Sequence, residues 1–169
     1  MSQLLFLFFS LIISPVISSE HAVVQKPDFL VLEKDTIFLN SFPLEYLNFQ
    51  QRPFKYGYFY FPNSSCWRGY QATWEVIDRK LFLIEIARVD ASREKIDLIA
   101  YFAANNYTPT IINGKIFADW FTADLKSYPR DFGKWSCNFK SYKCKRFKSE
   151  IRFENGVMVF NKYKSRKFI

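Results

Sequence analysis

Histidine is nearly absent from this 169-residue chain, which contains only His21. Nucleophilic catalysis by a Ser-His-Asp or Cys-His arrangement would have to use that one residue, close to the N-terminus. Glycine and proline are also scarce, with five and seven residues, which argues against a fibrous or disordered chain. Gly69 and Gly133 do not form a phosphate loop, because no Gly-rich turn precedes a helix. These absences disfavour a histidine-dependent enzyme and a nucleotide-binding protein of the phosphate-loop type.

Side-chain charge is missing from the first nineteen residues. Residues 4–13 are apolar at all positions but one, and this run is shorter than the roughly 20 residues that span a membrane. Pro15 and several small residues follow, as in a secretory signal peptide. The sequence therefore predicts a signal peptide over residues 1–18, cleaved before Ser19 or before Glu20, and an exported protein, periplasmic or secreted. Because no Lys or Arg precedes the apolar core, the alternative is an uncleaved N-terminal segment that anchors the protein in the membrane.

Cysteine occurs only three times, as Cys66, Cys137 and Cys144. Three cysteines without a nearby histidine lack the spacing of a zinc site, so neither a metal nor a cofactor is predicted. An oxidising compartment permits disulfides, and Cys137 and Cys144 stand seven residues apart, which suits a bridge that closes a hairpin. So short a loop would add about 2–2.5 kcal/mol to the stability. Either cysteine could instead pair with Cys66, so three single bridges remain open.

Negative charge is scarce in the last quarter of the chain. Residues 134–169 contain 11 Lys and Arg but only two acids, Glu150 and Glu154, whereas the preceding residues contain 13 basic and 14 acidic ones. The net charge of +8 therefore belongs to this basic C-terminal segment, which predicts an anionic partner: an anionic lipid, a cell-wall polymer or an acidic protein. Nucleic acid is disfavoured, because an exported protein would meet it only outside the cell. The alternative is a solvated surface that keeps the protein soluble.

Two stretches of the basic C-terminal segment, residues 140–148 and 161–169, interleave cations with Tyr and Phe. Such patterns dock on anionic surfaces, with charge for attraction and aromatic rings as anchors. The alternative is an edge hairpin and a tail whose lysines prevent aggregation. The candidate binding residues are Lys143, Lys145, Arg146, Lys162, Lys164, Arg166 and Lys167.

Aromatic residues, by contrast, are abundant and make up 20% of the chain. They favour the half-buried surfaces of β-sheets. About 150 residues remain after the signal peptide, enough for one domain with its own core, over residues 19–169. The predicted fold class is mainly β, a β-rich α+β domain built as an antiparallel sandwich or open barrel with about one helix.

The clearest strand signal lies between residues 67 and 77, where apolar and polar side chains alternate. Trp74 and Val76 are expected on the core face. Residues 78–80 then form a three-residue turn, and residues 81–87 return as the second strand of a hairpin. The predicted cross-strand pairs are Val76–Phe82 and Trp74–Ile84.

Tight turns predict three further hairpins. They are Lys34-Asp35 between residues 29–33 and 36–39, Asn113-Gly114 before a strand over 116–123, and Asn155-Gly156 between 150–153 and 157–160. The aromatic run at residues 56–61 predicts another strand. The one helix is predicted over residues 91–105, with an apolar stripe and a cap at Asp90 or Ser92.

Three strings of residues carry a resemblance. They are Cys66-Trp67-Arg68-Gly69-Tyr70-x-Ala72-Thr73-Trp74-Glu75, Lys80-Leu81-x-Leu83 and Phe117-Ala118-Asp119-Trp120. Over roughly residues 65–125 the chain resembles a group of uncharacterised bacterial proteins that share the C-W-R-G-Y-x-A-T-W-E and F-A-D-W motifs. The resemblance implies a shared β core and brings no known activity with it.

Arg68 and Asp119 each stand among the aromatic residues of these motifs, and we expect them to form a bidentate ion pair. The preferred interpretation is structural, an ion pair at the edge of the core that fixes the strand order. In the alternative, Arg68 and Asp119 line a pocket together with Trp74 and Trp120 and grip a polar ligand.

Glu75 and Asp119 are the alternative catalytic residues. Two carboxylates can hydrolyse a glycosidic bond, and the tryptophans of the motifs would supply stacking faces for sugar rings. The leading hypothesis is a non-catalytic, exported binding or interaction protein that uses its basic C-terminal face. The alternatives are a carbohydrate-active protein and a toxin-neutralising or inhibitor protein, which would present the same face to an acidic partner. No pattern predicts the oligomeric state.

Overall fold

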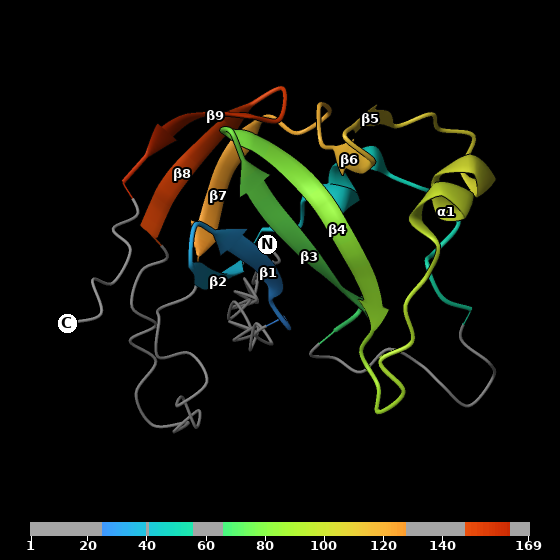
Figure 1. Ribbon diagram of the computed structural model, residues 1–169. Helices are drawn as coiled ribbons and strands as arrows, with labels where there is room; N and C mark the ends of the chain where they lie inside the picture. Colours follow the sequence, from blue (N-terminus) through green and yellow to red (C-terminus); the bar gives the residue numbers. More distant parts are fainter. Residues whose placement is uncertain (1–24, 40, 56–65, 128–147, 163–169) are drawn as a thin grey trace, which may run out of the picture.

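The computed structural model describes residues 25–39, 41–55, 66–127 and 148–162. These residues form a β-rich domain, a mixed sheet of nine strands that is nearly closed into a barrel, with one α-helix beside it (Figure 1). The predicted fold class is thus confirmed. In chain order the elements are β1 (Asp28–Leu32), β2 (Asp35–Leu39), the 3-10 helix η1 (Pro43–Leu47), β3 (Tyr70–Ile77), β4 (Lys80–Arg88), α1 (Leu98–Ala104), β5 (Thr110–Ile112), β6 (Lys115–Phe117), β7 (Ala123–Ser127), β8 (Lys148–Glu154) and β9 (Val157–Asn161).

Seven of the strands follow one another around a ring, in the order β3-β1-β2-β7-β8-β9-β4, and β4 pairs with β3 again to complete it. Two joints of this ring are narrow: β2 meets β7 at Leu39 and Ser127, and β4 meets β9 at Lys80 and Val157. β6 and β5 extend the sheet from the outer edge of β4. One pairing, between β1 and β3, is parallel, so the sheet is not wholly antiparallel.

Several strands end at one rim of the barrel, which we call the Asp28 rim. Asp28 lies opposite Leu39, Leu39 opposite Ser127, and Ser127 opposite Lys148. β9 runs towards the same rim and ends at Asn161, opposite Ile151, which lies three residues after the start of β8. The described chain therefore enters β1, leaves β7, enters β8 and leaves β9 at this one rim.

The barrel interior is filled by alternate residues of its strands, since successive side chains of a strand point to opposite faces. Leu30 of β1, Trp74 of β3, Ile86 of β4 and Phe153 of β8 are among those fully buried. Trp120 packs edge-on against Trp74 and also against Phe102 of α1, which extends the core to the helix.

The β3–β4 hairpin is present, but its predicted register is wrong. The turn contains two residues, Asp78 and Arg79, both at positive φ, and Ile77 pairs with Lys80. A two-residue turn with both residues at positive φ matches the right-handed twist of the flanking strands. The pairs are consequently Val76–Leu81 and Trp74–Leu83.

The helix is shorter than predicted. It begins at Leu98, and its cap is Asp97, whose side chain accepts a hydrogen bond from the backbone N–H of Ala100. Asp90 and Ser92 do not cap it, because the chain between them and Asp97 follows β4 instead. There the backbone N–H of Arg88 donates to the Glu94 carbonyl, and that of Ile96 donates to the Ile86 carbonyl.

The two Asn-Gly turns join strands as predicted, β5 to β6 and β8 to β9. The β1–β2 turn is also present, one residue earlier than predicted, at Glu33 and Lys34. The predicted strand over 116–123 is wrong beyond Phe117, because the chain turns there and Phe121 donates from its backbone N–H to the Ala118 carbonyl. The aromatic run 56–61 lies outside the described residues.

Candidate functional site

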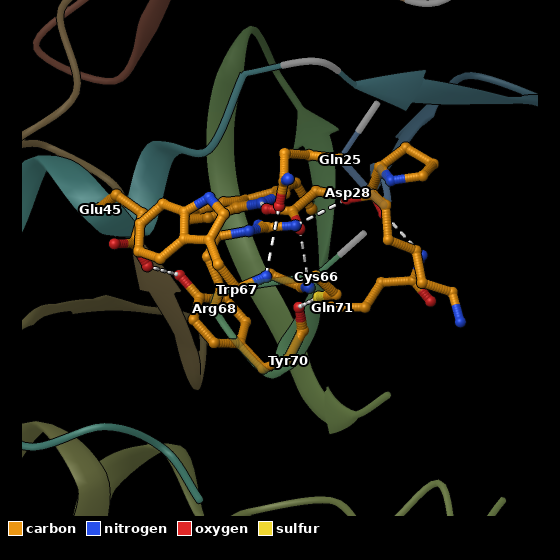
Figure 2. A network of polar contacts seen from close by, with 12 residues as sticks. Gln25, Asp28, Glu45, Cys66, Trp67, Arg68, Tyr70 and Gln71 are labelled. Carbon is orange, nitrogen blue, oxygen red and sulfur yellow. Dashed lines mark hydrogen bonds and ion pairs between the residues drawn. The ribbon is translucent and has the colours of Figure 1, made fainter. Parts of the chain in front are cut away.

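The residues of the Cys66–Tyr70 string lie at the Asp28 rim, where they lead into β3 at Tyr70. A tight turn, with the Gly69 N–H donating to the Cys66 carbonyl, carries the chain into β3, and Gly69 has φ +74°. This conformation strains any residue with a Cβ. Cys66, Arg68 and Tyr70 are all buried, and the guanidinium group of Arg68 lies inside this end of the barrel (Figure 2).

The partner of Arg68 is Asp28 on β1, at 2.8 Å between Nη1 and Oδ1, and both side chains are completely buried. Asp28 also accepts hydrogen bonds from the Ala72 backbone N–H and from the Trp74 indole N–H. Arg68 donates a second bond, from Nη2 to the Lys26 carbonyl at 2.7 Å. The predicted pairing of Arg68 with Asp119 is therefore wrong, because the parallel pairing of β1 with β3 brings a different carboxylate to it.

Arg68 keeps its charge in this position. Burial disfavours the guanidinium, but the carboxylate of Asp28, together with Tyr70 and Cys66, outweighs that effect and raises the pKa of Arg68. The cation also lies over the ring of Phe42, at 3.6 Å from its centroid, and near that of Tyr70 at 5.2 Å. Among the described residues, no group accepts a hydrogen bond from Arg68 Nε.

A second layer of polar contacts links this buried pair to the surface. The Tyr70 hydroxyl donates to Glu45 of η1, and Arg52 donates from Nη1 to both carboxylate oxygens of Glu45, at 3.2 and 3.1 Å. Arg52 in turn lies 5.2 Å from the ring centroid of Trp67, an indole that is 49% exposed. The network thus runs from the barrel interior to solvent, as Figure 2 shows for Arg68, Tyr70 and Glu45.

A hollow of about 250 Å³ lies where this network reaches the surface, and we call it the η1 hollow. Its lining consists of Leu44, Glu45, Asn48, Phe49, Gln50, Arg52 and Tyr101. The loop after η1 is tied to α1, because the backbone N–H of Gln51 donates to Asn105 and the Gln51 side chain donates to the Ala104 carbonyl.

Sequence reasoning missed Glu45, Arg52 and Asp28. Pro43 made the segment around Glu45 ambiguous in structure, and Asp28 stands 40 residues before Arg68. One signal could have helped: alternation puts Tyr70 on the same face of its strand as Trp74, and a buried tyrosine hydroxyl usually has a hydrogen-bond partner.

Tyr101, which lines the η1 hollow, predicts that the protein loses stability at alkaline pH. Burial, followed by the negative charge of Glu45, raises the pKa of Tyr101 to about 12. Because the folded-state pKa exceeds the ordinary value of about 10, the stabilisation is complete below pH ~10 and is lost as the pH rises towards 12. Between pH 8 and pH 11.5, urea unfolding should therefore show a marked decrease in the free energy of unfolding for the wild type and a smaller decrease for Tyr101→Phe. Tyr46→Phe, at an exposed ring, is the control, and an equal alkaline loss in all three proteins would contradict the prediction.

The predicted aromatic binding residues belong mainly to the core. Trp74 is fully buried, and Trp120 donates its indole N–H to the Pro43 carbonyl at 3.1 Å. Trp120 is partly buried, and Trp67 is the tryptophan of the motifs that is largely exposed.

The two alternative catalytic carboxylates have separate partners. Glu75 pairs with Lys115 of β6 at 2.8 Å, and Asp119 accepts a hydrogen bond from the Thr110 hydroxyl. Neither residue lines the η1 hollow. The arrangement gives glycoside hydrolysis by Glu75 and Asp119 no support.

Most of the predicted basic binding residues lie outside the described residues: Lys143, Lys145, Arg146, Lys164, Arg166 and Lys167, as do Cys137 and Cys144. Lys162 is described and exposed, with its ammonium 5.3 Å from the centroid of the Phe160 ring. Cys66 is a buried free thiol that donates to the Tyr70 carbonyl.

Within the described parts of the chain, no group of three or more His, Cys, Asp or Glu side chains is placed to hold a metal ion. In those same parts, no helix has the length and apolar character needed to cross a membrane. Comparisons with models of protein families, with curated proteins and with solved structures gave no match. The resemblance to the bacterial group therefore remains a prediction.

Proposed function

We propose that this protein is an exported, non-catalytic binding protein that docks on anionic lipid surfaces through its basic C-terminal segment. The segment carries 11 basic and two acidic residues, and the charge-free apolar run at residues 4–13 supports export. The observation that carries the proposal is the position on the barrel at which the strands connect to this segment.

Both basic stretches are attached at the Asp28 rim. Residues 134–147, with five cations and no acid, belong to the connection between the end of β7 and the start of β8, and residues 162–169 follow the end of β9. The predicted signal peptide or anchor precedes β1 at the same rim. An anchor retained there would therefore bring the cations to the membrane, so both localisation hypotheses agree with the same docking rim.

The β9 strand adds apolar surface next to these cations. Val159 and Phe160 are exposed, and Lys162 lies against the Phe160 ring. Apolar side chains beside cations favour a lipid surface over an acidic polymer or protein, because they can enter the headgroup region while the cations neutralise phosphates.

Binding should depend on lipid charge, on salt and on Lys162. Each cation near an anionic membrane is worth about 1 kcal/mol, so Lys162→Gln should weaken binding to phosphatidylglycerol vesicles about fivefold. Removal of residues 162–169, with four cations, should weaken it about a thousandfold. Co-sedimentation with vesicles at low and high salt measures both effects.

Lys34→Gln is the matched control, since it removes one exposed cation from the β1–β2 turn, at the opposite end of these strands from the Asp28 rim. It should bind as the wild type does. Absence of binding to anionic vesicles at low salt, or an equal loss in the Lys34 variant, would refute the proposal. Binding to an acidic protein in place of vesicles would favour the inhibitor hypothesis.

A further inference from the structure

We propose that the η1 hollow, together with the exposed indole of Trp67, binds one neutral monosaccharide unit. The proposal does not depend on lipid docking. Figure 1 places α1, which contributes Tyr101 to the hollow, and β9 on opposite sides of the barrel. A ligand in the hollow would therefore lie away from β9 and Lys162, although Trp67 itself stands at the Asp28 rim.

Charge pairing in the hollow favours an uncharged ligand. Glu45 and Arg52 already neutralise each other, so an ionic ligand would have to compete with an existing ion pair. A sugar hydroxyl can donate to the carboxylate and accept from the guanidinium without separating them. Both contacts of Arg52 with Glu45 use Nη1, so the Nε and Nη2 donors are not engaged by Glu45. Asn48 and Gln50 add two exposed amides to the lining.

The polar groups are held in place before any ligand arrives. The Tyr70 hydroxyl fixes the Glu45 carboxylate, and the Tyr70 ring is itself buried beside Arg68. On the other side, the Gln51–Asn105 contacts tie the loop to α1. Such a site loses little conformational entropy when a ligand binds.

Trp67 supplies the apolar part of the site. Trp67 is 49% exposed, and the guanidinium of Arg52, which lines the hollow, lies over one face of its ring. An exposed aromatic ring next to convergent polar side chains suits a ligand with one apolar C–H face and hydroxyl groups at its edge.

The size of the hollow limits the ligand to a single ring. At about 250 Å³ it lies just below the ~300 Å³ at which sites for larger small molecules begin. So few contacts give weak binding, and we expect a dissociation constant on the order of 1 mM.

Isothermal titration of the full-length protein with glucose, galactose, mannose and N-acetylglucosamine tests this site. At least one sugar should bind at a single saturable site. Trp67→Ala and Glu45→Gln should each weaken binding about tenfold or more, because they remove the stacking surface and the charged acceptor. The Trp67 side chain is exposed, so its removal should leave thermal unfolding nearly unchanged.

Glu75→Gln is the matched control. The Glu75–Lys115 pair resembles the Glu45–Arg52 pair in side-chain exposure, 32% and 42% against 24% and 47%. This variant, and Lys162→Gln, should bind sugar as the wild type does, while Trp67→Ala should bind vesicles normally. Three results would overturn the assignment: no saturable binding up to about 100 mM, a hundredfold above the expected constant; wild-type affinity in the Trp67 and Glu45 variants; or loss of binding in Glu75→Gln.

Discussion

Replacing Arg68 with methionine should lower the free energy of unfolding by about 3–5 kcal/mol, because it leaves the Asp28 carboxylate buried without a cation. Asp28 and Arg68 are both completely inaccessible to solvent, so water cannot compensate either charge in the folded state. Urea unfolding at neutral pH, followed by tryptophan fluorescence and circular dichroism, measures the difference.

The double variant Asp28→Asn, Arg68→Met separates the cost of an orphaned charge from the cost of lost packing. An asparagine at position 28 carries no charge and can still accept from the Ala72 N–H through Oδ1, although its amide nitrogen cannot accept from the Trp74 indole N–H as the second carboxylate oxygen does. The double variant should therefore be more stable than Arg68→Met alone. If the two substitutions simply add, or if Arg68→Met costs less than about 1 kcal/mol, the buried pair does not have the electrostatic role assigned to it.

Replacing Gly156 with alanine should destabilise the protein by about 3 kcal/mol or more, far beyond the effect of the same change at Gly114. Both glycines are the second residue of an Asn-Gly turn, with φ +73° and +74°. A Cβ at Gly156 would lie 2.5 Å from the carbonyl oxygen of Ala118, whereas nothing lies within 4 Å of one at Gly114. Alanine therefore strains the backbone equally at both turns but collides with the main chain at only one of them.

Gly114→Ala measures the backbone strain alone, which is about 1 kcal/mol. The backbone around Gly156 cannot easily shift to relieve this clash. Its backbone N–H donates to the Phe121 carbonyl, and its carbonyl accepts from the Leu81 N–H, so the turn is fixed between β4 and the chain before β7. Similar unfolding free energies for the two variants would contradict the close approach of the β8–β9 turn to Ala118.

The turns and the fold class could be predicted because the sequence patterns that favour them lie within short stretches of the chain. Asn113-Gly114 and Asn155-Gly156 favour two-residue hairpin turns irrespective of the rest of the chain. The β3–β4 register was harder, because Asp78 and Arg79 occupy the positive-φ positions of their turn without the glycine that marks such turns. The helix start was missed since residues 94–96 pair with β4, a tertiary contact that overrides local preference.

The candidate site could be predicted only in part. The Cys66–Tyr70 string correctly indicated Arg68 as a residue of interest, but it did not indicate which carboxylate pairs with Arg68. The parallel pairing of β1 with β3 brings Asp28 to Arg68, and no local pattern encodes a contact between residues 40 positions apart. Charged residues are almost never fully buried unless they are paired. The pattern of apolar and polar residues therefore predicts that Arg68 and Asp28 are exposed, and it cannot reveal a buried ion pair.

The narrow joints of the barrel have a mechanical consequence. Within the described residues, β7, β8 and β9 are joined to one another over several residue pairs but to the ladders of β2 and β4 at one pair each. Separating β7 from β2 breaks few sheet hydrogen bonds, and local openings of low cost define cooperative sub-globular units. Local opening of the barrel should therefore begin between Leu39 and Ser127, which widens the Asp28 rim while the β8–β9 turn stays hydrogen-bonded to Leu81 and Phe121.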